Sequence, residues 1–294
     1  MSAGEAVVAA PRGRRPGRRP GRRPGSRPGT LSIVCLVWLA VVVVWAVLGP
    51  LVSGFAATEG NIVDRYLPAG GAHWLGTDQA GRDLFTRLAV GARSSILGAL
   101  VVAALTAVCG ATLALVAVWF GGWVDGAVSR VLDFLFAFPN LLLALLAAAV
   151  FGGGMTTAVL ALAIGYTPYT ARVIRSVALR ERALPYVRAA ELQGIAGPVI
   201  TVRHLLPNVR QQVATGAAIN FGYAMIDLAA LSYLGFGVQA PDADWGLMVA
   251  SGQSSMLAGH PQECLYAGVC IVLTVAALGY LGERVGGRRA AGRA

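Results

Sequence analysis

Acidic residues and histidines are the side chains through which this chain could perform acid–base chemistry, and they are few. The sequence has 14 acidic residues and 3 histidines among 294. Asp78 and Asp83 could suggest a pair of catalytic carboxylates. A structural interpretation is simpler: Thr77 or Asp78 caps a helix, Asp78 pairs with Arg82 one turn on, and Arg87 has the same spacing from Asp83. We therefore expect no catalytic residue and no enzymatic activity.

The residues that commonly bind metals are dispersed along the sequence. No two cysteines form a CxxC pair, and no histidine has a second ligand three or four residues away. We expect apolar, buried cysteines, no metal site and no cofactor. The residues concerned are Cys35, Cys109, Cys264, Cys270, His73, His204 and His260.

Lysine is absent, because all 24 basic residues are arginine. A P-loop requires a lysine that reaches the phosphates of the nucleotide. The chain therefore has no P-loop, and we expect any ATP hydrolysis coupled to its function to occur on partner subunits.

The composition places these side chains in a membrane protein. Hydrophobic residues make up 56% and charged residues 13%, against about 25% charged in soluble domains. About 20 apolar residues span a bilayer as a helix, so we predict an all-α polytopic protein with six transmembrane helices. They are Leu31–Ser53, Ser94–Phe120, Val131–Phe151, Met155–Ala171, Val213–Gly237 and Glu263–Gly282.

The arginines predict the orientation, since basic loops stay on the cytoplasmic side. Residues 1–30 hold eight arginines in an Arg/Pro/Gly-rich stretch that we expect to be disordered, and that either binds anionic lipid or is simply solvated. Residues 172–212 hold seven more. We predict that both are cytoplasmic, together with the tail 285–294. The segment 54–93 is then an extracytoplasmic loop, and 94–284 form a five-helix core.

The basic segment 172–212 has the start and stop signals of two short helices. Pro185 opens the first, and Gly194 permits a sharp turn after it. Pro198 opens the second and Pro207 ends it. A rigid helix pair outside the membrane, joined to spans on both sides, is suited to transmitting force.

The sequence "RAAELQG" followed by "RHLLPN" resembles the cytoplasmic EAA loop of permease subunits in ABC-type importers. Arg188 stands where the family usually has Glu, which removes one acidic contact and leaves the spacing unchanged. In the family this loop docks on the ATPase subunit. The resemblance therefore implies an ATPase-coupling loop that includes Tyr186, Arg188, Ala189, Ala190, Glu191, Gly194, His204, Leu206 and Pro207.

Three further segments are similar to the dipeptide/oligopeptide/nickel group of these permeases: "HWLGTDQAGRDLFTRLAVGARSSI", "RVLDFLFAFPNLLLALL" and "LSYLGFGVQAPDADWGLMV". The resemblance implies a type I importer architecture and the C-type partner of a permease heterodimer in a bacterial inner membrane. Its implied partners are a second permease, two ATP-binding subunits, an extracytoplasmic binding protein and membrane lipid, and no nucleic acid. Short peptides are the implied cargo, with nickel or glutathione as alternatives. A membrane scaffold or sensor without transport is the alternative of another class.

Residues inside the predicted spans could line a pathway or an interface. An acidic residue at membrane depth is costly, so Asp227 either has a functional role, lies near the lipid headgroups, or has a structural partner such as Arg130. Pro139 and Pro168 interrupt backbone hydrogen bonding and are expected to kink their helices. Asp133 is expected to pair locally with Arg130. Alanines spaced by four could pack against a partner: Ala99, Ala103, Ala107 and Ala111.

Overall fold

A computed structural model describes the backbone of residues 30–290, and the side chains of residues 30–282 and 284. Of the predicted tails, residues 1–29 and 291–294 lie outside this range. The described residues form helices and two isolated β-bridges without a strand, so the all-α prediction is confirmed. The helices are α1 Thr30–Ser53, α2 Leu84–Phe120, α3 Gly122–Phe136, α4 Asn140–Phe151, α5 Met155–Arg182, α6 Pro185–Leu192, α7 Gly197–Ile200, α8 Leu206–Tyr233, α9 Trp245–Leu257 and α10 Gln262–Ala290; η1 (Ile62–Asp64) and η2 (Thr201–Leu205, π-helical) are short turns.

Four of these helices are long and apolar enough to cross a membrane, or five if the bent pair α3–α4 is one span. The four are α1, α2, α8 (continuous with α7 and η2) and α10. The 28-residue α5 is long enough to cross but carries several arginines near its end. Each of the six predicted spans thus corresponds to a long helix or to the bent pair.

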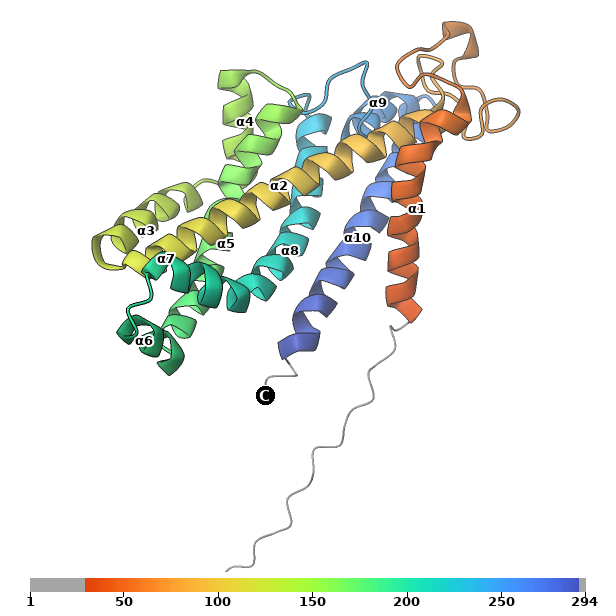
Figure 1. The fold of residues 1–294 in the computed structure, drawn as a ribbon. Coiled ribbons are helices and arrows are strands. Elements are labelled where there is room, and N and C mark those ends of the chain that lie inside the picture. The colour runs from red at the N-terminus through yellow and green to blue at the C-terminus, as the bar shows by residue number, and fades with distance from the viewer. Residues whose placement is uncertain (1–29, 291–294) are drawn as a thin grey trace, which may run out of the picture.

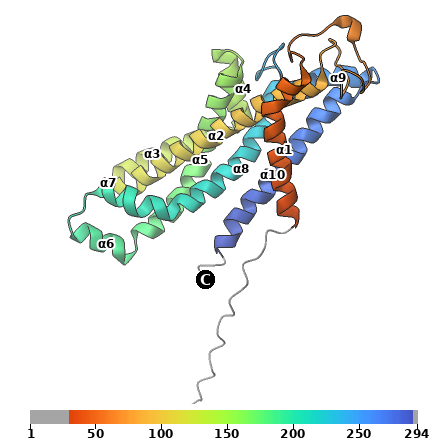
Figure 2. The ribbon, with the colours of Figure 1, turned by 45° about the vertical axis from the view of Figure 1, so that its right-hand side comes forward.

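The helices lie side by side with two distinct ends (Figures 1 and 2). One end holds α6 and α7, the start of α1 and the end of α10; we call it the basic end. The other holds residues 54–83 and α9; we call it the loop end. The helix α9 was not predicted, because its 13 residues are too few for a span and were taken as part of a loop.

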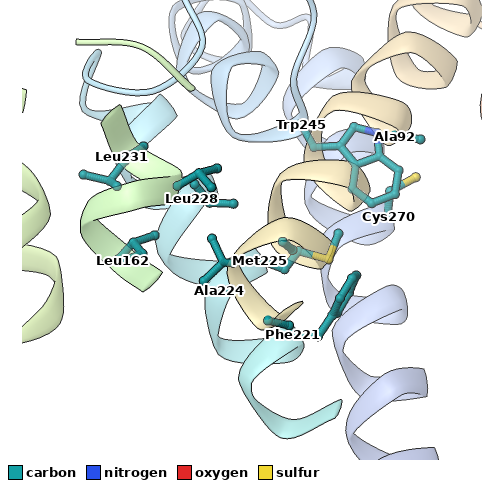
Figure 3. Close-up of a cluster of buried hydrophobic side chains, with 14 of the residues drawn as sticks. Ala92, Leu162, Phe221, Ala224, Met225, Leu228, Leu231, Trp245 and Cys270 are labelled. Atoms are coloured by element: carbon teal, nitrogen blue, oxygen red, sulfur yellow. The ribbon is translucent and has the colours of Figure 1, made fainter. Parts of the chain in front are cut away.

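The main core lies where α2, α5, α8 and α10 meet (Figure 3). Trp245 of α9 is fully buried there, and its indole nitrogen donates to the carbonyl of Leu88 at 2.9 Å. The alanine stripe of α2 is buried inside the same chain. A Cβ added at Gly110 would lie 2.8 Å from the Thr170 methyl. The small residues of α2 therefore allow α5 to approach closely, and they need no partner chain.

The predicted span Val131–Phe151 is broken, because α3 and α4 meet at an angle of 84°. Pro139 stands directly before α4 and lacks the N–H that a continuing helix requires. Two ion pairs tie α3 to α5: Asp125 with Arg175, and Asp133 with Arg172. The predicted pairing of Asp133 with Arg130 is wrong, since the bend places α3 alongside α5.

Candidate functional site

The basic loop between α5 and α8 is a compact, docked unit. Val187 and Ala190 of α6, together with Ile200 and Leu205, are buried in a second hydrophobic cluster. Residues of α2 and α5 complete that cluster. An isolated helix of eight residues is unstable in water, so α6 owes its structure to this packing.

Gly194 reverses the chain after α6. Its φ is +76°, a left-handed conformation that favours glycine. The amide of Ile195 donates to the carbonyl of Ala190 at 3.2 Å, and the amide of Gly194 to that of Glu191 at 3.0 Å, which closes the helix end. A Cβ at Gly194 would meet no atom within 4 Å, so a side chain there would project into open space.

A polar cluster ties α6 to both neighbouring long helices. The hydroxyl of Tyr186 donates to Glu181 at the end of α5 at 3.1 Å. The amide of Asn208, in the first turn of α8, donates to the Tyr186 hydroxyl at 2.9 Å and to Glu181 at 3.3 Å. These hydrogen bonds connect α6 to α5 and to α8.

Arg182 fastens the same region to α2. Its guanidinium donates to the carbonyl of Trp119 at 2.6 Å and to that of Val118. It also lies 4.9 Å from the centre of the Trp119 ring. These carbonyls end α2 without intrahelical partners, so a cation there is favourable.

The outward face of α6 is exposed and mixed in character. Arg188, Ala189 and Glu191 are exposed, whereas Ala190 faces the cluster. Leu192, which was not among the predicted loop residues, is 89% exposed. A single exposed apolar side chain is common on protein surfaces.

The remaining predicted loop residues lie in η2 and at the start of α8. His204 is partly buried, with its ring 6.3 Å from that of Tyr186. Leu206 and Pro207 are exposed in the first turn of α8. The prediction that Pro207 ends the second short helix is wrong. A proline is compatible with a first helical turn, so helical structure continues through Pro207 into α8.

Asp227 lies on α8, where the hydroxyl of Tyr166 on α5 donates to its Oδ2 at 2.6 Å. The suggestion that Arg130 pairs with Asp227 is wrong. Arg130 lies on α3, and the bend at Pro139 directs α3 away from α4. An ionised aspartate at the centre of a membrane costs about 2.5–3.5 kcal/mol on insertion scales. Two turns before Asp227, the buried Asn220 donates to Thr170 at 2.8 Å. Tyr166, Thr170 and Asn220 were not predicted, although the polar positions on α8 recur with helical spacing.

Pro168 lies inside α5, and that helix continues without a break to Arg182. Pro139 by contrast separates α3 from α4. Pro139 thus coincides with an interruption between two helices, whereas Pro168 lies within an uninterrupted helix, and a kink at Pro168 stays a prediction.

The carboxylates of the loop end are structural. Asp83, and not Thr77 or Asp78, caps α2 by accepting from the amide of Thr86 at 2.8 Å. Asp78 is paired with Arg82 at 2.7 Å as predicted. Arg87 lies 3.4 Å from Asp78 and does not pair with Asp83. The carboxylate oxygen of Asp83 that does not cap α2 lies 3.0 Å from Nδ1 of His73.

Asp244 caps α9 from a buried position. It accepts from the hydroxyl of Ser95 at 2.9 Å and from the amide of Gly246 at 3.2 Å. Burial raises the pKa of Asp244 to about 6, and the hydrogen bonds from Ser95 and Gly246 partly oppose this shift.

Among the described side chains, those of residues 30–282 and 284, no three His, Cys, Asp or Glu converge as metal ligands would. The four cysteines are free; Cys35 and Cys270 are buried, Cys264 is partly buried and Cys109 is exposed. Cys109 thus departs from the prediction of buried cysteines, because it lies on the outer side of α2.

The long apolar helices joined by the basic loop are those of a multi-pass membrane protein. Residues 106–289 match the family of binding-protein-dependent transport system inner membrane components. The chain belongs to this family of bacterial inner-membrane permeases, as the resemblance predicted.

Curated relatives cover most of the chain. The dipeptide transport system permease protein DppC of Alkalihalophilus pseudofirmus is 34% identical over 86% of this chain and 83% of its own length. The probable D,D-dipeptide transport system permease protein DdpC of Escherichia coli is 35% identical over 84% of each chain. The glutathione transport system permease protein GsiD of Pectobacterium atrosepticum is 36% identical over 72% of this chain and 70% of its own.

A chain of the MetNI methionine ABC transporter in an inward-facing conformation has a similar fold. The TM-score is 0.54, with 18% identity over 68% of this chain and 94% of that chain. At this identity the similarity concerns the fold alone, and it supports the predicted importer permease architecture.

Proposed function

We propose that this chain is one permease subunit of an ATP-driven importer that moves short peptides across the bacterial cytoplasmic membrane. Its relatives include permeases named for dipeptide and peptide transport. The proposed assembly has a second permease, two ATP-binding subunits and an extracytoplasmic binding protein. The basic end is cytoplasmic, with both termini, and the loop end faces the binding protein.

The loop 172–212 is proposed as the coupling loop, in which the exposed face of α6 docks on an ATP-binding subunit. The observation that carries this proposal is the attachment of α6. It is buried through Val187 and hydrogen-bonded through Tyr186 to both α5 and α8. ATP-driven displacement of α6 would therefore move both long helices. Proposed pathway or interface residues are Asp227, Pro139 and Pro168.

Two glycines provide a matched test. Gly194 and Gly235 both have positive φ and open space around an added Cβ, but Gly235 lies at the loop end. Gly194→Asp should insert normally, lose peptide uptake and lose co-purification of the ATP-binding subunit in mild detergent. Gly235→Asp should retain that subunit.

Normal uptake by Gly194→Asp would overturn the coupling-loop assignment. A wild-type complex, expressed in its own host, that contains no ATP-binding subunit would instead favour a membrane scaffold or sensor. Mass spectrometry of the purified complex distinguishes these outcomes and identifies the binding protein.

A further inference from the structure

Two hydrogen bonds between side chains join α5 and α8 within the membrane-spanning region. Tyr166 donates to Asp227 at 2.6 Å, and Asn220 donates to Thr170 at 2.8 Å. Asn220, Tyr223 and Asp227 recur at i, i+3 and i+7, which places them on one face of α8. Asn220 is buried, Asp227 is partly exposed and Tyr223 is exposed, so this face of α8 extends from the interior of the bundle to its outer surface.

Among the side chains that the structure describes (residues 30–282 and 284), none is a counter-ion for Asp227. Tyr166 supplies one neutral hydrogen bond to Oδ2, and no arginine or histidine lies within ion-pair distance of the carboxylate. Arg172, on the neighbouring α5, is already paired with Asp133. Membrane-embedded acids are usually paired, so the cation that completes this site must come from outside the described chain.

The site is accessible from outside the bundle. Asp227 is partly exposed, and Tyr223 one turn earlier is 58% exposed. Asp227 stands six residues before the end of α8 at Tyr233, or about 9 Å along the helix. A solute entering from the loop end would meet this position early in its passage.

We infer that Asp227, with the rings of Tyr166 and Tyr223 beside it, binds the primary ammonium group of a peptide during import; this inference rests on the proposed function. The carboxylate neutralises the ammonium, and the Tyr166 hydroxyl holds the carboxylate in place. Phenol rings attract cations through their π faces.

The chemistry of the cargo favours an ammonium over another cation. Peptides of different sequence share their backbone groups and one free amino terminus, while their side chains vary. A permease that passes varied peptides can recognise only shared groups. A single carboxylate flanked by tyrosines matches the amino terminus in charge and requires no particular side chain.

The test uses the reconstituted complex of both permeases, the ATP-binding subunits and the binding protein, with a tripeptide that has a free amino terminus as the probe. Asp227→Asn should lower the maximum uptake rate about tenfold or more, because a charge-assisted contact is lost. The half-saturating peptide concentration and the stimulation of ATP hydrolysis by loaded binding protein should stay unchanged. Asp227→Glu should retain most of the uptake. Asp133→Asn, which removes a carboxylate from α3, is the control and should transport normally.

Uptake by Asp227→Asn within about twofold of wild type would refute the inference, because removing the only charge at the site must slow passage. Loss of the second permease from the Asp227→Asn complex would also overturn it, in favour of an ion pair between subunits. A wild-type complex that imports no peptide would refute the proposed function itself, and the inference with it.

Discussion

Val187 is the main anchor of α6, and its truncation should loosen the coupling loop without unfolding the bundle. The side chain is fully buried in the second hydrophobic cluster. Val187→Ala removes two methyl groups, at about 0.8 kcal/mol each, and leaves a small cavity, so the total is about 2 kcal/mol. Since about 1.4 kcal/mol corresponds to a factor of ten, the undocked state of α6 should become roughly tenfold to thirtyfold more populated.

Hydrogen exchange measured by mass spectrometry provides the assay. Amides of residues 185–192 should exchange faster by that factor, while those of α10 should not change, because α10 packs in the separate main core. Transport per ATP hydrolysed should fall, since an undocked α6 transmits less movement.

The control is Val202→Ala, because Val202 lies in η2 of the same loop but is 63% exposed. It should leave exchange and coupling unchanged. Equal protection of residues 185–192 in wild type and Val187→Ala would refute the reasoning. It would mean that the polar cluster around Tyr186 suffices to hold α6.

Further substitutions test the packing and the buried charge. Gly197→Ala would place a methyl 2.1 Å from the Trp119 ring, so the free energy of unfolding should fall by an amount typical of overpacking, about 1–3 kcal/mol, and the melting temperature should fall with it. Gly216→Ala, which meets open space, should lower neither. The raised pKa of Asp244, about 6, means that its contribution to stability is complete below its unfolded pKa near 3.8 and is lost as the pH rises through 6. As the pH rises from 5 to 8, the melting temperature of wild type should therefore fall relative to that of Asp244→Asn. A pH-independent difference between the two melting temperatures would contradict this.

Features determined by local sequence were predicted well. Pro185 begins α6, Gly194 adopts a positive φ, and Pro139 separates α3 from α4. Each follows from the covalent restrictions of proline or the freedom of glycine, which act within a few residues. The long apolar stretches likewise predicted helices, because hydropathy is a property of the segment itself.

Pairings between distant residues could not be predicted. Asp133 had an arginine three residues away, yet it pairs with Arg172 on another helix. Arg87 had Asp83 one turn before it, yet it lies nearer Asp78. In both cases the pairing depends on a nearby change of chain direction, the bend after α3 for Asp133 and the turn before α2 for Arg87, and that geometry is set by packing between helices.

The contrast between α1 and α5 has a consequence for how the chain enters the membrane during synthesis. Most of the large apolar side chains of α1 are exposed, and its mean hydropathy is 2.9. It can therefore leave the insertion machinery and partition into lipid before any other helix exists. In α5, Tyr166, Thr167 and Thr170 are buried against other helices. Because Tyr166 and Thr170 hydrogen-bond to Asp227 and Asn220 of α8, which is made later, we expect α5 to be retained near the insertion machinery until α8 emerges. The order of synthesis and the order of stable insertion should differ.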